Sequence, residues 1–145
     1  MSTLQPARAG VPTPVPSAVS KRYWDGCRAG ELRYQRCANC GSTGLRPATI
    51  CGTCHQRTLE WHVSAGRGTL YSWTVVWRAQ HPTFDVPYAP AIVQLDEGFW
   101  LMSAIIGCEP EDLRPDLPLE VEFHAISDEI SLPYFRWTGE EPANR

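Results

Sequence analysis

The sequence predicts a mainly β protein with a short N-terminal helix, a rubredoxin-like zinc ribbon and a C-terminal five-stranded OB-fold barrel. Two C-x2-C pairs separated by ten residues predict the ribbon. Five short strand-like runs after the ribbon, joined by glycine-containing and proline-containing bends, predict the barrel. A length of 145 residues with 43% hydrophobic content is sufficient for one buried core.

Four cysteines carry the metal-site prediction, and the ligand positions are Cys37, Cys40, Cys51 and Cys54. Each C-x2-C pair turns a knuckle that directs two thiolates at one point, and two knuckles complete a tetrahedral sulfur cage suited to zinc. A glycine follows one cysteine of each pair, where a tight turn lets backbone amides approach sulfur. We therefore expect a structural zinc ribbon over residues 36–62.

Other uses of these cysteines are less favoured. Iron in a rubredoxin-like site would take the same four ligands. Two disulfides would suit an oxidising compartment, but the chain begins without the charged and then apolar pattern of a secretory signal, which favours a reducing cytoplasm. A catalytic zinc needs an open position, and four thiolates leave none. His55, beside Cys54, is expected at the surface and not as a fifth ligand.

The part before the ribbon divides into two segments. Residues 1–19 are rich in Ala, Pro, Ser and Thr without an apolar period, so they are expected to be a disordered tail or linker. Residues 20–35 are expected to hold a short helix, with Ser20 as its N-cap and Gly30 as its stop. Tyr23 and Trp24 on this helix either cover the domain's own core or form a stripe that binds a partner. Cys27 is expected to be a packed thiol.

The barrel is expected over residues 63–140, followed by a tail over 141–145. The run 69–77 is predicted as a strand because its large residues, Tyr71, Trp73, Val75 and Trp77, fall on one face at period two. Runs 91–95 and 99–106 form a hairpin, since the segment between them, 96–98, ends in glycine. Alternation over 119–125 and a short run at 134–138 complete five strands. Gly-x-Gly at 66–68 is expected at a barrel bend.

Two long proline-marked connections, 79–89 and 108–118, are the predicted recognition loops. The first contains His81, Phe84 and Tyr88, which we expect to contact a partner. The alternative is that this loop is only a surface excursion.

No catalytic residue is predicted. The chain lacks the G-x-S-x-G elbow, the phosphate-binding G-x-x-x-x-G-K loop and the H-E-x-x-H zinc motif. Cys108 follows an apolar run without an activating base and is expected to be an inert buried thiol. No apolar run approaches the roughly 18 residues that would span a bilayer, so no membrane association is expected.

Single-stranded nucleic-acid binding is an alternative function because zinc ribbons and OB barrels occur in such proteins. The net charge of −3 and the single lysine oppose it, since a phosphate backbone requires a basic surface. Arginines are concentrated in the front half of the chain, where they could meet a phosphate group such as that of coenzyme A.

The order of these features resembles the acyl-CoA-associated zinc-ribbon/OB-fold family, a domain family of unknown function, over residues 20–138. The matching features are Tyr23-Trp24, Gly30-Glu31-Leu32, Cys37-x2-Cys40-Gly41, Pro47, Cys51-x2-Cys54, Trp61, Gly66-x-Gly68-x2-Tyr71-Ser72, Pro87-Tyr88 and Asp96-Glu97-Gly98. The ribbon alone is generic, whereas the succession of all these features is more specific.

The resemblance implies a non-catalytic accessory subunit that binds a thiolase-fold enzyme acting on acyl-CoA. Within the family, the resemblance is to the partner of thiolase-fold aldolases that cleave CoA-activated steroid side chains by a retro-aldol step. It implies a heterotetramer with the aldolase homodimer, and acyl-CoA at the interface is a further possibility. The alternative is an accessory domain of a thiolase or of a MaoC-like acyl-CoA hydratase, to which the proline-rich start would be the linker.

Overall fold

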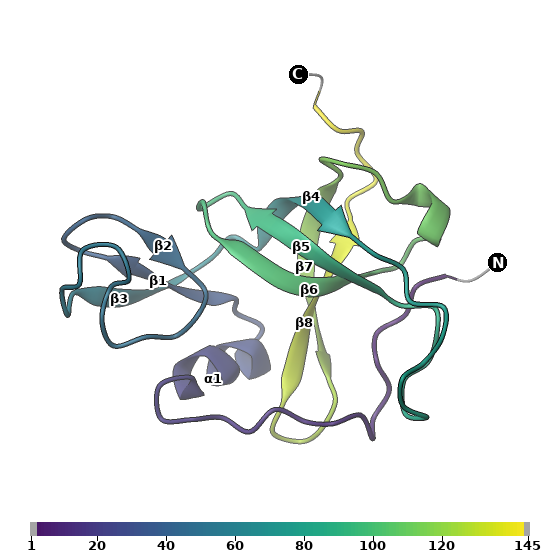
Figure 1. Ribbon diagram of the computed structural model, residues 1–145, viewed down its shortest axis with the longest axis horizontal. Helices are drawn as coiled ribbons and strands as arrows, with labels where there is room; N and C mark the ends of the chain where they lie inside the picture. Colours follow the sequence, from purple (N-terminus) through teal and green to yellow (C-terminus); the bar gives the residue numbers. More distant parts are fainter. Residues whose placement is uncertain (1–2, 144–145) are drawn as a thin grey trace.

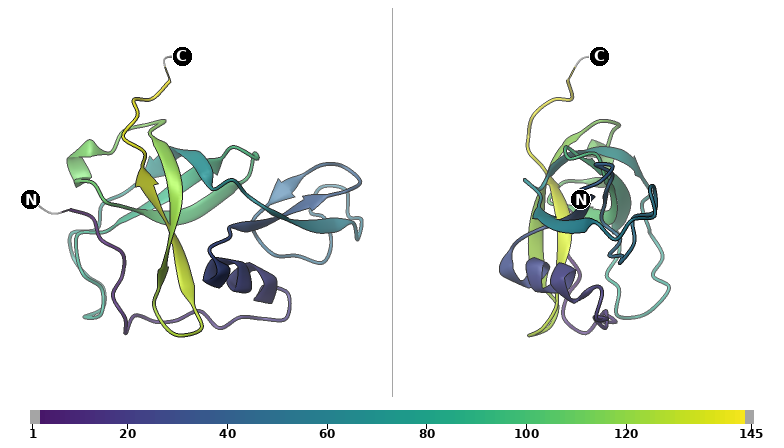
Figure 2. Two further views of the ribbon diagram at one scale, coloured as in Figure 1. Left: turned by 180° about the vertical axis from the view of Figure 1, so that it is seen from behind. Right: turned by 90° about the vertical axis from the view of Figure 1, so that its left-hand side faces the viewer.

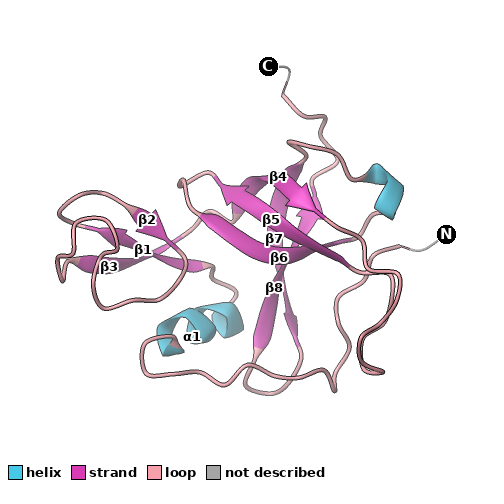
Figure 3. Cartoon of the chain, in the orientation of Figure 1, coloured by secondary structure: helices cyan, strands magenta, loops and turns pink. Residues whose placement is uncertain are grey.

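The computed structural model describes residues 3–143 and consists of a small ribbon and a barrel with one short helix beside them (Figures 1 and 3). The ribbon is a three-stranded sheet of order β2-β1-β3, and the barrel is closed with the order β4-β5-β6-β8-β7. The elements are α1 (Lys21–Ala29), β1 (Arg33–Cys37), β2 (Thr43–Gly44), β3 (Leu59–Val63), β4 (Arg67–Trp73), β5 (Ala89–Leu95), β6 (Trp100–Ile106), the 3-10 helix η1 (Pro110–Asp112), β7 (Pro118–Ala125) and β8 (Ser131–Trp137). The predicted fold class is confirmed.

Barrel closure depends on a glycine in β4. Gly68 pairs with Leu95 of β5 on one side and with Leu119 of β7 on the other. A Cβ atom at this position would lie 2.3 Å from the carbonyl oxygen of Gln94. Only glycine therefore lets β4 approach β5 closely enough to be shared by both neighbours. The barrel closes where β6 and β8 pair in parallel.

The ribbon and the barrel share one hydrophobic core. The ring of Tyr34 on β1 stacks on Phe99, which directly precedes β6 in the β5–β6 hairpin, with ring centroids 4.8 Å apart. Cys27 and Tyr23 of α1 and Leu32 after it belong to the same buried cluster as the barrel interior. The helix begins after Ser20 and ends at Gly30, which has the left-handed backbone (φ 78°) that favours glycine.

The Glu97 carboxylate fixes the junction between ribbon and barrel. It accepts hydrogen bonds from the Ser64 hydroxyl at 2.9 Å and from the Ala65 backbone N–H at 2.7 Å. The Thr43 hydroxyl of the ribbon donates to the Glu97 carbonyl oxygen at 3.3 Å. The adjacent Gly98 has φ 96°, which confirms the predicted hairpin turn.

The first barrel strand differs from its prediction. It ends at Trp73 instead of Trp77, and the pairing of β4 with β5 shifts register between Leu70 and Ser72. Such a bulge interrupts strict alternation, so the large residues of the run do not all share one face. Leu70 is the buried core residue, whereas Tyr71 and Trp77 are more than half exposed.

The proline-rich start also differs from the expected disordered tail or linker. Residues 3–16 form no helix or strand, but they lie along the barrel before reaching α1 (Figure 2). The backbone N–H of Leu4 donates to the Cys108 carbonyl at 2.9 Å, and its carbonyl accepts from the Gly107 N–H at 2.8 Å. The Leu4 side chain is fully buried, and Val11 packs with Ile126. Leu4 in the main core and Val11 in the second cluster thus hold an otherwise irregular segment. None of the helices in residues 3–143 is long and apolar enough to cross a membrane.

Candidate metal centre and contact surfaces

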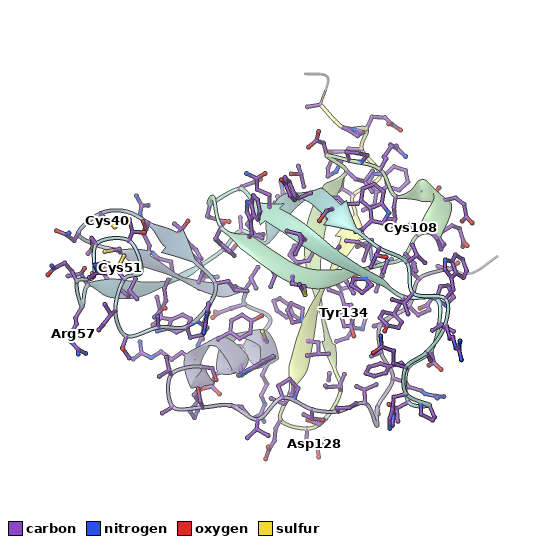
Figure 4. All side chains as sticks on the ribbon, viewed as in Figure 1. Cys40, Cys51, Arg57, Cys108, Asp128 and Tyr134 are labelled. Atoms are coloured by element: carbon purple, nitrogen blue, oxygen red, sulfur yellow. The ribbon has the colours of Figure 1, made fainter. Side chains whose placement is uncertain are left out.

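The four predicted cysteines converge at one point of the ribbon. Cys37 ends β1, Cys40 lies in the turn before β2, and Cys51 and Cys54 lie in the loop before β3. Their Sγ atoms all lie within 4.8 Å of one another, and the Cys37–Cys54 and Cys40–Cys51 pairs are each 3.6 Å apart. Figure 4 shows Cys40 and Cys51 at the ribbon end of the molecule, away from Tyr134 in the barrel.

This spacing fits a tetrahedral metal cage. Zinc–sulfur bonds of about 2.3 Å give a tetrahedron whose sulfur atoms are about 3.8 Å apart, whereas a disulfide requires about 2.05 Å. The four cysteines are free. Four thiolates would fill every position of a tetrahedral ion, so the arrangement is that of a structural centre. The four cysteines are therefore arranged for metal binding.

The two knuckles have the same backbone geometry. The N–H of Gly41 donates to the Cys37 carbonyl at 2.8 Å, and the N–H of His55 donates to the Cys51 carbonyl at 2.9 Å. Gly41 and His55 both have left-handed backbone, with φ 76° and 60°. The position after the second cysteine is thus the one that requires positive φ, and the second knuckle places an exposed histidine there. Gly52, which the sequence places beside a tight turn near sulfur, does not have positive φ.

Nearby donors favour the thiolate forms of two ligands. The Thr58 hydroxyl, 3.1 Å from Cys37 Sγ, is the main cause that lowers the pKa of Cys37 to about 6. Backbone N–H groups of Cys54 and Thr53 lower the pKa of Cys51. The thiolate is the metal-binding form of cysteine, so these contacts favour that form at two of the four ligands, whereas burial and the neighbouring thiols of Cys37 and Cys40 raise the pKa of Cys54. Sequence reasoning missed Thr58, whose only signal was its position directly before β3.

Gln35 is a second residue that sequence reasoning missed. It is 5% exposed, and its amide oxygen accepts from the Ala48 N–H at 2.8 Å while its amide nitrogen donates to the Ala48 carbonyl at 3.0 Å. The side-chain amide therefore pairs with the Ala48 backbone as a neighbouring strand would, and it holds the loop between the two knuckles in place.

The remaining two cysteines are buried thiols, as expected. Cys27 and Cys108 are 1% and 7% exposed. Burial raises the pKa of each to about 11. Both are therefore protonated at neutral pH, which is unsuited to a nucleophile.

The two aromatic residues of α1 have different surroundings. Tyr23 is 8% exposed and belongs to the main core, and its burial raises its pKa. This corrects the expectation of a partner contact at Tyr23 in favour of the core alternative. Trp24 is half-buried, meets the Tyr23 ring edge-on at 4.9 Å and packs against both hydrophobic clusters.

The predicted contact loop lies against the N-terminal segment. His81, Phe84 and Tyr88 form a series of ring contacts, with centroids 6.4 and 6.0 Å apart. Phe84 packs against the small cluster around Val11, as does Trp24. The structure therefore places two of the predicted contact residues, one from the helix and one from the loop, around the same cluster.

A mainly apolar cavity of about 240 Å³ lies between this loop and the N-terminal segment. Phe84 and Tyr88 line one side, and Tyr134 of β8 lines another. The Tyr134 hydroxyl accepts a hydrogen bond from the Ala7 N–H at 3.0 Å, and Arg8 pairs with Asp85 at 3.3 Å. Of the three loop residues, only His81 is exposed.

Two family models match adjacent parts of the chain. Residues 24–60 match the model described as ChsH2, rubredoxin-like zinc ribbon domain. Residues 61–124 match the model described as ChsH2, C-terminal OB-fold domain. Their boundary falls between Glu60 and Trp61, within β3 and just before the Glu97 junction described above.

Curated relatives include two longer hydratase subunits. A probable enoyl-CoA hydratase alpha subunit of Thermomonospora curvata is 29% identical over 92% of this chain and 42% of its own length. The 3-oxo-4,17-pregnadiene-20-carboxyl-CoA hydratase alpha subunit of Mycobacterium tuberculosis is 31% identical over 73% of this chain and 34% of its own length. The chain thus spans less than half of either subunit.

A shorter relative and a solved structure match most of their own length. A DUF35 domain-containing scaffold protein of Methanocaldococcus jannaschii is 32% identical over 65% of this chain and 68% of its own length. A chain of the structure described as "Ltp2-ChsH2(DUF35) aldolase" is 28% identical, with a TM-score of 0.79 over 86% of this chain and 98% of its own.

Proposed function

The chain belongs to the ChsH2-type (DUF35) family of zinc-ribbon and OB-fold proteins, and on this basis we propose that it is a non-catalytic accessory subunit of a thiolase-fold enzyme acting on acyl-CoA. The enzyme is, in this proposal, an aldolase that performs retro-aldol cleavage of CoA-activated steroid side chains. The observation that carries the proposal is the TM-score of 0.79 over 98% of a chain from the Ltp2-ChsH2(DUF35) aldolase.

The chemistry of the described residues favours a non-catalytic role. Within residues 3–143, the two thiols outside the ribbon are buried and have raised pKa values. The four ribbon cysteines form a closed set with no position for a substrate. The reaction would therefore be performed by groups of the partner.

Zinc is the proposed metal, held by Cys37, Cys40, Cys51 and Cys54. It would supply structure and not catalysis, because four thiolates would fill every position of a tetrahedral ion. Iron would fit the same sulfur cage and is the less favoured alternative. The lowered pKa values of Cys37 and Cys51 support binding of a cation at neutral pH.

The proposed assembly is a heterotetramer in the cytoplasm, with two copies of this chain on an aldolase homodimer and with acyl-CoA near the interface. The loop residues His81, Phe84 and Tyr88, with Trp24 from the helix, are proposed as contacts. Since Phe84 and Trp24 also pack against the cluster around Val11, replacing either should lower stability as well as affinity.

Co-expression with a thiolase-fold aldolase from the same genome tests the proposal. We expect the two chains to co-elute in size-exclusion chromatography, and retro-aldol cleavage of a steroid-CoA substrate to require both. Separate elution, together with an aldolase whose rate is indifferent to this chain, would refute it. The chain alone serves as the control for independent activity.

A hydratase complex is the second candidate, favoured by the similarity to two longer relatives that are hydratase alpha subunits. Those proteins are hydratase alpha subunits, of which the chain matches less than half. Co-elution with a MaoC-like hydratase, and a hydration rate that depends on this chain, would select this function. The net charge of −3 continues to disfavour nucleic-acid binding.

A further inference from the structure

The outer face of β4, β5 and β6 is apolar and exposed. Met102 and Trp100 project from β6 with 74% and 53% of their surface exposed, and Tyr71 projects from β4 with 54% exposed. Ile92 of β5 pairs with Met102 and is half-buried beside it. These four residues are called the outer apolar face below. The solvent side of an antiparallel sheet is normally polar, so this face is unusual.

Two of the three strands that carry this face contain no charged residue. β5 and β6 have no Asp, Glu, Lys or Arg in either strand, although 20% of the whole chain is charged. The central part of protein interfaces is depleted of charged residues and enriched in Trp, Tyr and Met. The outer apolar face has that composition.

The geometry of the face is suited to docking. The Tyr71 and Trp100 rings lie 4.5 Å apart at an interplanar angle of 34°, so each fixes the other in place. Beside them, Met102 borders a shallow groove of about 270 Å³ that is also lined by Trp73 and Ile92. Side chains that are held in place before association lose less entropy when a partner binds.

The exposed area agrees with the centre of an interface. With roughly 200 Å² per large side chain, the exposed fractions of Met102, Tyr71 and Trp100 amount to roughly 360 Å². One partner in a standard interface contributes about 800 Å². The three side chains thus supply nearly half of that area, and the polar loops around them can supply the rim.

We infer that the outer apolar face is the surface that docks onto an uncharged, apolar patch of the thiolase-fold partner, an inference that rests on the proposed function. The occupant is the partner enzyme because the similar ChsH2 chain belongs to a structure described as an Ltp2-ChsH2(DUF35) aldolase. The absence of charge on β5 and β6 requires a matching uncharged surface on the partner. The loop contacts at 81–88 then flank the interface and do not form its centre.

Replacing Met102 with Asp tests this surface. The substitution places a charge where the partner would exclude water, and we expect the dissociation constant for the co-expressed thiolase-fold aldolase to rise about 30-fold or more. Trp100→Ala should weaken binding in the same direction. Val15→Asp is the matched control, because Val15 is 90% exposed and lies in the N-terminal segment. The melting temperature of each purified variant is measured alongside.

The possible results distinguish a failure of the proposed docking surface from a failure of the proposed function. If the unmodified chain fails to bind the aldolase, the proposed function fails and this inference fails with it. If the unmodified chain binds and folded Met102→Asp binds equally well, only the surface is refuted. A chain that dimerises alone through this face, with aldolase binding unaffected in the variant, would assign the surface to a second copy and overturn the inference.

Discussion

Gly68→Ala is a sharp test of how the barrel closes. The new Cβ would lie 2.3 Å from the Gln94 carbonyl oxygen and 3.0 Å from its carbon, and both atoms belong to the backbone. A normal carbon–oxygen contact is about 3.3 Å or more, so β4 and β5 must separate by roughly 1 Å. The backbone of β5 cannot rotate away as a flexible side chain would, since it also pairs with β6.

The expected cost of this substitution is about 3 kcal/mol, at the upper end of overpacking effects. For a chain of this length that corresponds to a fall of roughly 10 °C in melting temperature. Circular dichroism during thermal and urea unfolding measures both quantities. Gly44→Ala is the matched control, because an added Cβ there meets nothing within 4 Å. If the two substitutions lowered the melting temperature equally, the claim that β4 needs glycine at position 68 to pair with both β5 and β7 would be refuted.

Three further predictions concern the ribbon and the acid stability of the barrel. His55→Gly should stabilise the metal-loaded chain by about 0.5–1 kcal/mol, because His55 holds φ 60°, and a lower unfolding midpoint would contradict this. Cys37→Ser should reduce bound zinc, measured by elemental analysis, from one ion to none and unfold the ribbon, since metal supplies on the order of 10 kcal/mol in such peptides; full zinc content would exclude the assignment. Arg136 lowers the pKa of Glu122 to about 2, so Glu122 stabilises the fold above about pH 4.5, and this contribution is lost as pH falls from 4.5 toward 2. Because both side chains are more than one third exposed, Glu122→Gln should cost about 1 kcal/mol or less at pH 7 in urea unfolding and progressively less as pH falls through about 2.

The ribbon and the barrel were predictable because their signals are local. Four cysteines at fixed spacing specify a metal cage regardless of what surrounds them. A turn with Gly98 between two apolar runs specifies a hairpin. The closed barrel was predicted from five strands joined by glycine-containing bends. In the structure, Gly68 lies so close to the Gln94 backbone that a Cβ atom would not fit.

The N-terminal segment was beyond sequence reasoning because its order depends on distant partners. Leu4 and Val11 are two apolar residues in a proline-rich stretch, which by composition resembles a disordered tail. Leu4 is held by the backbone at positions 107 and 108, more than 100 residues away in sequence. Nothing near Leu4 in the sequence indicates that contact.

The outer apolar face was also beyond sequence reasoning. An apolar run such as 100–106 does not show which of its residues face the core, and the bulge in β4 removes the alternation that would have assigned Tyr71. The partner-contact residues predicted from the sequence lie instead on the N-terminal helix and in the loop 79–89. One of them, Tyr23, belongs to the core instead.

Native mass spectrometry of this chain, co-expressed with the thiolase-fold aldolase of the same genome, tests the accessory-subunit proposal most directly. We expect one assembly with two copies of each chain and one zinc ion per copy of this chain, and retro-aldol activity in that assembly alone. Free aldolase dimers and separate copies of this chain, with full activity in the aldolase by itself, would contradict the proposal.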